Sequence, residues 1–171
     1  GTAAQRKGLA QVAAAFADSP EYHPQARAIL TELMNDDDEG VLKACAAALQ
    51  DTTLGLFADS PEFLNAYAAS RAFQRFPSTL LHRLKDHTGS LIPFSSCVLE
   101  VCRSLATAKN AERNKSFWEV EYYLVPVLLR LYEQVCEGDD VREQSLNAWD
   151  LLLEARVASA ISLTKELETE S

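Results

Sequence analysis

Six consecutive residues occur twice in this chain of 171 residues. Residues 16–21 read FADSPE, and the same letters return at residues 57–62, 41 positions later. An aromatic residue follows each copy, at Tyr22 and Phe63. A repeat of this length is typical of arrays in which pairs of helices stack on one another, and such arrays bind other molecules more often than they catalyse reactions.

Helical periodicity runs through most of the chain. Apolar residues recur three and four positions apart, and Pro, Ser or Asp marks the start of successive segments. The pattern predicts helices over residues 3–17, from 24 to the aspartates at 36–38, over 38–49, from 61, from 77, from 93, over 116–136, from 141 and over 157–167. Residues 109–115 are expected to form a polar connector. The sequence therefore predicts an all-α fold, an α-solenoid of about eight helices in antiparallel pairs.

The length suits one domain with a continuous core. We expect a single helical-repeat domain over residues 1–171, with repeats near 16–56 and 57–108 and a further stretch over 116–171. Gly1-Thr2 resembles an expression remnant, and we expect the chain to be a fragment of a larger protein. The sequence has no run of 18 apolar residues and no apolar leader, which predicts a cytoplasmic chain without a membrane span.

The periodicity also assigns individual faces. Leu9, Val12, Ala13 and Phe16 are expected to form the apolar face of the first helix. The apolar stripe of the helix from 77 is expected to contain Leu80, Leu81 and Leu84. That of the helix from 93 is expected to contain Cys97, Val98, Val101, Cys102 and Leu105. The three aspartates at 36–38 are interpreted as helix-capping residues rather than as a metal site, because no calcium-loop spacing follows them.

Few residues in the sequence point to a chemical function. The four cysteines are Cys45, Cys97, Cys102 and Cys136; each lies among apolar residues, which predicts buried, reduced thiols. The three histidines are expected at the surface. No phosphate-binding loop, nucleophile motif or zinc spacing occurs in the sequence, so we predict no enzymatic activity, cofactor or metal for this chain.

Charge is distributed unevenly. The net charge is −9, but residues 71–115 contain eight Lys or Arg against three acids, a local net of +5 that leaves −14 for the remainder. A candidate binding set lies in this span: Arg71, Arg75, Arg83, Lys85 and Arg103. Arg71 and Arg75 are four residues apart, so on one helix they would face an acidic partner together. Solvated helix faces with local ion pairs are the alternative interpretation.

Aromatic residues cluster where the longest predicted helix begins. Trp118, Tyr122 and Tyr123 either anchor a protein interface or belong to the core. We include Trp118 and Tyr122 among the candidate binding residues.

Several segments resemble known helical repeats. Residues 38–49 (DEGVLKACAAAL) look like the second helix of a HEAT repeat, and Asp139-Asp140-Val141-Arg142 resembles the same start. Residues 78–89, 98–102, 128–134 and 141–154 together resemble the C-terminal helical-repeat region of large bacterial STAND-type NTPases, many of which are antiphage sensors.

This resemblance implies a sensor or regulatory arm that recognises a protein ligand or other domains of its own polypeptide, while nucleotide hydrolysis resides in a separate domain. No catalytic residue carries over. Two alternatives stay open: a free-standing HEAT-like scaffold, and a nucleic-acid-binding HEAT-like domain that uses the basic span. The acidic net charge argues against nucleic acid.

Overall fold

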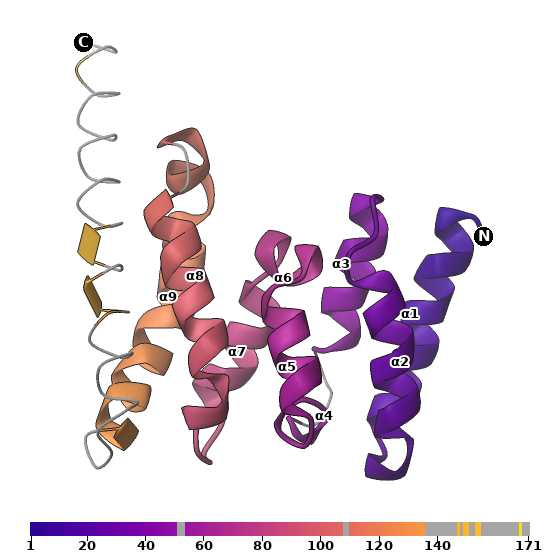
Figure 1. The fold of residues 1–171 in the computed structure, drawn as a ribbon. Coiled ribbons are helices and arrows are strands. Elements are labelled where there is room, and N and C mark those ends of the chain that lie inside the picture. Colours follow the sequence, from indigo (N-terminus) through magenta and orange to yellow (C-terminus); the bar gives the residue numbers. More distant parts are fainter. Residues whose placement is uncertain are drawn as a thin grey trace. The chain divides into compact units, whose positions relative to one another are not determined.

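A computed structural model describes residues 1–50, 54–107 and 110–135, together with positions 147, 149, 150, 153, 154 and 168. Side chains between 110 and 118 lie outside this description, and so do the helices predicted from 141 and over 157–167. Every regular element in the described ranges is a helix, which confirms the all-α prediction (Figure 1).

The chain divides into two compact units, Gly1–Asp86 and His87–Ser171. The first contains α1 (Ala3–Ala17), the 3₁₀ helix η1 (Pro20–Tyr22), α2 (His23–Leu33), α3 (Glu39–Ala48), α4 (Gly55–Ala58), α5 (Pro61–Ala68), α6 (Arg71–Arg75) and α7 (Ser78–Asp86). The second contains η2 (Ile92–Phe94), α8 (Ser95–Thr107) and α9 (Asn110–Val135). The single domain and its repeat boundaries stay predictions.

The first unit is built around α1, α3 and α5. Helix α1 packs against α2 and α3, α3 also contacts α6 and α7, and α5 contacts α2, α4 and α6. The largest fully buried side chains of this unit are Leu30, Leu49, Leu56, Phe57, Tyr67, Phe73, Leu80, Leu81 and Leu84. The apolar stripe expected for the helix after Pro77 is confirmed, because Leu80, Leu81 and Leu84 are all buried in α7.

The twin hexapeptides occupy the same kind of junction. In each copy Phe-Ala ends a helix, Asp follows, and Ser-Pro begins the next element, η1 or α5. The serine N–H donates to the carbonyl oxygen of the Phe three residues earlier, at 3.3 Å in the first copy and 3.1 Å in the second. That Phe ring contacts the aromatic ring six residues later, with centroids 5.6 and 5.5 Å apart. Both junctions lie at the lower end of the first unit in Figure 1.

The two copies differ in how far they are covered. Phe57 and Phe63 are buried, and Tyr67 and Phe73 extend their ring cluster. The corresponding rings of the first copy are only half-buried at Phe16 and exposed at Tyr22. The same turn between two helical elements is therefore buried in the second copy and partly exposed in the first.

The apolar face expected for the first helix is wrong in part. Helix α1 buries Ala10, Ala13 and Ala17, whereas Leu9 and Val12 are exposed. The small alanine side chains let the backbones of α2 and α3 approach α1 closely. Leu9 and Val12 lie in a row on another side of the same helix. Because both rows are apolar, periodicity alone could not select the buried one.

In the second unit, α8 buries the five residues that the sequence predicted: Cys97, Val98, Val101, Cys102 and Leu105. Helix α9 packs against α8 and η2 and binds the loop before η2 through polar side chains. Gln134 accepts from the Leu91 N–H at 2.6 Å and donates to the Gly89 carbonyl at 3.2 Å, and Arg130 donates to the His87 carbonyl.

The connector predicted over residues 109–115 is wrong from residue 110, because α9 already begins at Asn110. Its sequence there, NAERNK, is rich in good helix formers, so a helix can continue without an apolar stripe. Pro126 lies inside α9. Among the described helices none combines the length and hydropathy needed to cross a membrane.

Candidate protein-interaction surface

The connection between α2 and α3 binds the start of α6. The Met34 carbonyl accepts from the Ala72 N–H at 2.9 Å, and Asn35 Oδ1 accepts from the Arg71 N–H at 3.0 Å. These two N–H groups belong to the first turn of α6, where no helical partner exists for them. Ser70 completes the cap by accepting from the Phe73 N–H at 3.2 Å. The connection therefore fixes where α6 begins.

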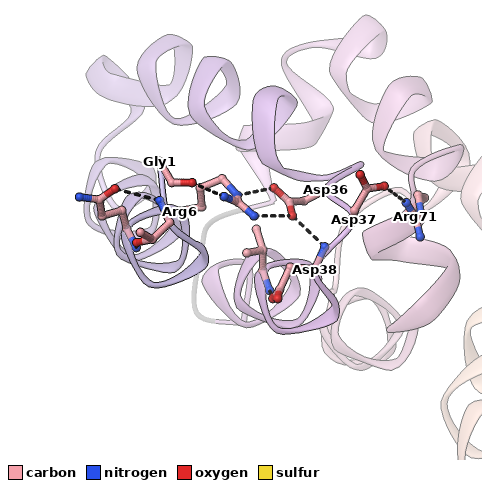
Figure 2. A network of polar contacts seen from close by, with 9 residues as sticks. Gly1, Arg6, Asp36, Asp37, Asp38 and Arg71 are labelled. Carbon is pink, nitrogen blue, oxygen red and sulfur yellow. Dashed lines mark hydrogen bonds and ion pairs between the residues drawn. The ribbon is translucent and has the colours of Figure 1, made fainter.

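The next residue of this connection binds α1 (Figure 2). Arg6 Nε lies 2.7 Å from Asp36 Oδ2 and Arg6 Nη2 lies 3.2 Å from Asp36 Oδ1, a two-pronged contact. Asp36 Oδ1 also accepts from the Asp38 N–H at 2.8 Å. The bond from Arg6, followed by that backbone bond, holds the pKa of the Asp36 carboxyl below its ordinary value; Asp36 in turn raises the pKa of Arg6.

Capping, the role predicted for all three aspartates, is confirmed for Asp38. Its side chain accepts from the Val41 N–H at 2.9 Å and starts α3. Asp36 and Asp37 bind arginines instead. Among the described residues, no group of three or more His, Cys, Asp or Glu side chains is placed to hold a metal ion.

The predicted arginine pair lies on α6, one turn apart. Arg71 Nη1 lies 2.9 Å from Asp37 Oδ1, and Arg75 Nη2 lies 2.5 Å from Glu39 Oε1. The side chains of Arg71 and Arg75 are still 51% and 60% exposed. Local ion pairing, the alternative interpretation of these residues, is thus present, and both arginine side chains still remain more than half exposed.

The five basic candidates do not belong to one compact unit. Arg83 and Lys85 are half-buried near the end of α7, in the same unit as the arginine pair. Arg103 belongs to the second unit, where it pairs with Glu100 on α8 at 2.9 Å. The carboxylates that face Arg71 and Arg75 lie outside residues 71–115, so the local net charge of +5 along the sequence is reduced in space.

The aromatic candidates are described only in part. The Trp118 side chain lies outside the described residues. Tyr122 is 66% exposed, and its ring meets that of Tyr123 edge-on, with centroids 5.2 Å apart. The core interpretation is therefore wrong for Tyr122, because α9 turns a different stripe inward, including Val120, Leu124, Val127, Leu128 and Leu131.

The buried thiols expected from the sequence are confirmed for the described cysteines. Burial raises the pKa of Cys45, Cys97 and Cys102 to about 12, so these thiols stay protonated and unreactive at neutral pH. Cys136 lies outside the described residues.

The prediction that all histidines lie at the surface is wrong for His23, which is buried. Its ring folds back on the end of α1, where Nε2 lies 3.1 Å from the Ala17 carbonyl oxygen. That carbonyl belongs to the last turn of α1, so a protonated Nε2 supplies a donor that the helix itself lacks there.

Sequence reasoning missed one surface feature, an apolar hollow beside α1. Its volume is about 520 Å³, and its lining includes Gln5, Gly8, Leu9 and Val12 of α1 and Glu32 and Leu33 of α2. The signal was present in the sequence as a second apolar row, Leu9 and Val12, on a helix in which seven of the 15 residues are alanine.

No family model, curated protein or solved structure matches this chain. The resemblance to the STAND-type NTPases stays a prediction, and the geometry of the chain itself must support any functional proposal.

Proposed function

We propose that the chain is a non-catalytic protein-recognition module, a HEAT-like α-solenoid of antiparallel helix pairs that works in the cytoplasm. Following the resemblance above, its place would be the sensor or regulatory arm of a bacterial STAND-type NTPase in antiphage defence. The duplicated junction supports the solenoid, because identical sequences 41 residues apart form the same backbone turn and the same ring contact between two helical elements.

The observation that carries the proposal is the arginine pair of α6. Both guanidinium groups pair with carboxylates of the neighbouring α2–α3 connection and α3, yet both arginine side chains remain more than half exposed. Two arginine side chains one helical turn apart can each bind a carboxylate of the same partner. The pair is therefore prepared to contact an acidic protein surface.

The existing ion pairs do not prevent such a contact. The side chain of Asp37 is fully exposed and that of Glu39 is 64% exposed. Exposed ion pairs of this kind contribute only about 0–1 kcal/mol. An acidic partner can therefore replace or share these carboxylates at low cost, and the two-pronged geometry of arginine favours carboxylate recognition.

The experiment compares binding of a fluorescent decaglutamate peptide to the whole chain and to charge variants, by anisotropy at low salt. Arg71→Glu with Arg75→Glu should weaken binding about tenfold or more, because two attractive contacts become repulsive. Asp37→Asn with Glu39→Gln should strengthen binding, because the competing carboxylates lose their charge.

Arg103→Glu is the matched control, since it reverses one exposed arginine that also faces a carboxylate, but in the other unit. It should leave most of the binding in place. If the arginine pair can be reversed with unchanged peptide binding and unchanged thermal unfolding, α6 is not the contact surface.

A further inference from the structure

The arginine pair of α6 already binds a short acidic segment of its own chain. Asp37 faces Arg71 at 2.9 Å (Figure 2), and Glu39 faces Arg75 at 2.5 Å. Asp38, the residue between the two acids, takes part in neither contact, and its side chain caps the start of α3 instead. The segment therefore binds the arginines with carboxylates at alternate positions.

The spacing of the two partners explains why they fit each other. Arg71 and Arg75 are four residues apart on a helix that rises about 1.5 Å per residue, so they start about 6 Å apart along its axis. The backbone at Asp38 is extended, with φ −84° and ψ 122°. Two residues of extended chain span about 6–7 Å and place their side chains on one side. Alternate acids therefore match arginines one helical turn apart.

The register of this pairing is set by the chain around it. The Ala72 N–H donates to the Met34 carbonyl at 2.9 Å. The Arg71 N–H donates to Asn35 Oδ1 at 3.0 Å, and α3 also packs against α6. The first acid faces the first arginine and the second acid faces the second. The acidic segment therefore runs in the same direction as α6.

The two ion pairs are open to replacement by a partner. Arg71 binds through Nη1 and Arg75 through Nη2, whereas Arg6 binds Asp36 through two nitrogens. Both acids of the segment are more than half exposed, as are both arginines. Exposed pairs of this kind are weak, and a two-pronged contact from another carboxylate is stronger. A second acidic segment can therefore take the place of the first.

We propose that the arginine pair recognises an extended segment of a partner protein in which acidic residues occupy alternate positions, and that residues 37–39 are an internal competitor for the same site. This inference rests on the proposed function, because it assigns a sequence pattern to the acidic surface proposed there. The position between two acids needs no particular side chain, since Asp38 makes no contact with the pair's ion partners.

The test compares two fluorescent peptides by anisotropy at low salt. Both contain the same numbers of glutamates and serines, with glutamate at every second position in one peptide and at every third in the other. The protein is the whole chain with Asp37→Asn and Glu39→Gln, which removes the charge of the internal competitor. The alternating peptide should bind about threefold more tightly or better, because it alone can place neighbouring carboxylates against both arginines. Glutamates at every third position lie about 10 Å apart in an extended chain.

Arg75→Gln in the same variant is the matched control, since it leaves one arginine of the pair in place. It should weaken binding of both peptides and abolish the preference for the alternating one, because a single guanidinium group cannot distinguish two spacings. The wild-type chain should bind the alternating peptide more weakly than the Asp37, Glu39 variant, because residues 37–39 then compete for the arginines.

Three results would overturn the inference. The first is equal binding of the two peptides. The second is equal affinity of the wild-type chain and the Asp37, Glu39 variant for the alternating peptide. The third is tighter binding of an oligothymidylate of the same charge, which would favour a nucleic acid over a protein segment.

The failure of this inference can be told apart from the failure of the proposed function. If both peptides bind equally and both are released when Arg71 and Arg75 are changed to Glu, the arginine pair remains the contact surface and only the spacing rule is wrong. If that reversal leaves peptide binding unchanged, the proposed function fails as well.

Discussion

At the scale of single residues, Asp36 has the largest structural role of the three consecutive aspartates. Its carboxylate joins Arg6 of α1 to the turn that starts α3, through bonds to the Arg6 guanidinium and to the Asp38 N–H. Both bonds require the ionised form to be fully effective. The stability of the first unit should therefore depend on the charge of this one group.

Asp36→Asn tests that dependence through pH. The folded chain holds the pKa of Asp36 below its ordinary value of 3.8, so the ionised carboxylate stabilises the fold fully above that value. This advantage should be lost as pH falls from 3.8 through the lowered pKa. Urea unfolding of both proteins should show a gap in the free energy of unfolding at pH 7 that narrows below pH 3.8. A gap that stays constant with pH would show that Asp36 acts through shape alone.

At the scale of helices, the sequence predicted the buried stripes of α7 and α8 correctly, because leucine, valine and cysteine there alternate with polar residues. It failed for α1, where alanine and leucine rows are both apolar and only the fold decides which one is buried. It also failed for residues 110–115, where polar helix formers continue α9 without an apolar stripe.

For the candidate surface, the sequence predicted the arginine pair but not the carboxylates that it binds. A spacing of four residues was enough to place Arg71 and Arg75 together on one helix, as α6 confirms. Their carboxylate partners Asp37 and Glu39 lie 34 and 36 residues earlier, and only the packing of α3 against α6 brings them near. Pairing at such a separation leaves no periodic signal in a single sequence.

The twin serines give a prediction for individual helix starts. Ser60 Oγ accepts from the Phe63 N–H at 3.3 Å and caps α5, whereas Ser19 makes no side-chain bond of this kind. Ser60→Ala should therefore cost about 1 kcal/mol, and Ser19→Ala close to nothing. Chemical denaturation of the two variants measures both values against the same wild-type chain. If both variants lost the same free energy of unfolding, the contribution of the serine to stability would not depend on its side-chain cap to the following helix.

At the scale of the whole molecule, the division after Asp86 has consequences for folding. The buried core residues of the first unit extend from Ala10 in α1 to Leu84 in α7. Because this unit is compact and has buried core residues of its own, we expect it to fold independently.

A fragment of residues 1–86 should be helical by circular dichroism and should unfold cooperatively. A fragment of residues 1–59 is the control, because it ends between Phe57 and Phe63 and removes Tyr67 and Phe73 from the ring cluster. It should lose the cooperative transition. A featureless melt for residues 1–86 would show that the second unit is needed to hold the first together.

The connection between α2 and α3 is a loop whose length is constrained by the partners of its residues. Loops usually tolerate insertions. Here, however, consecutive positions are assigned to different helices: residues 34 and 35 to α6, 36 to α1, 37 again to α6, and 38 to α3. One additional residue would move several of these residues away from their partners at once, so natural variants of this chain should keep the residue count of this stretch fixed.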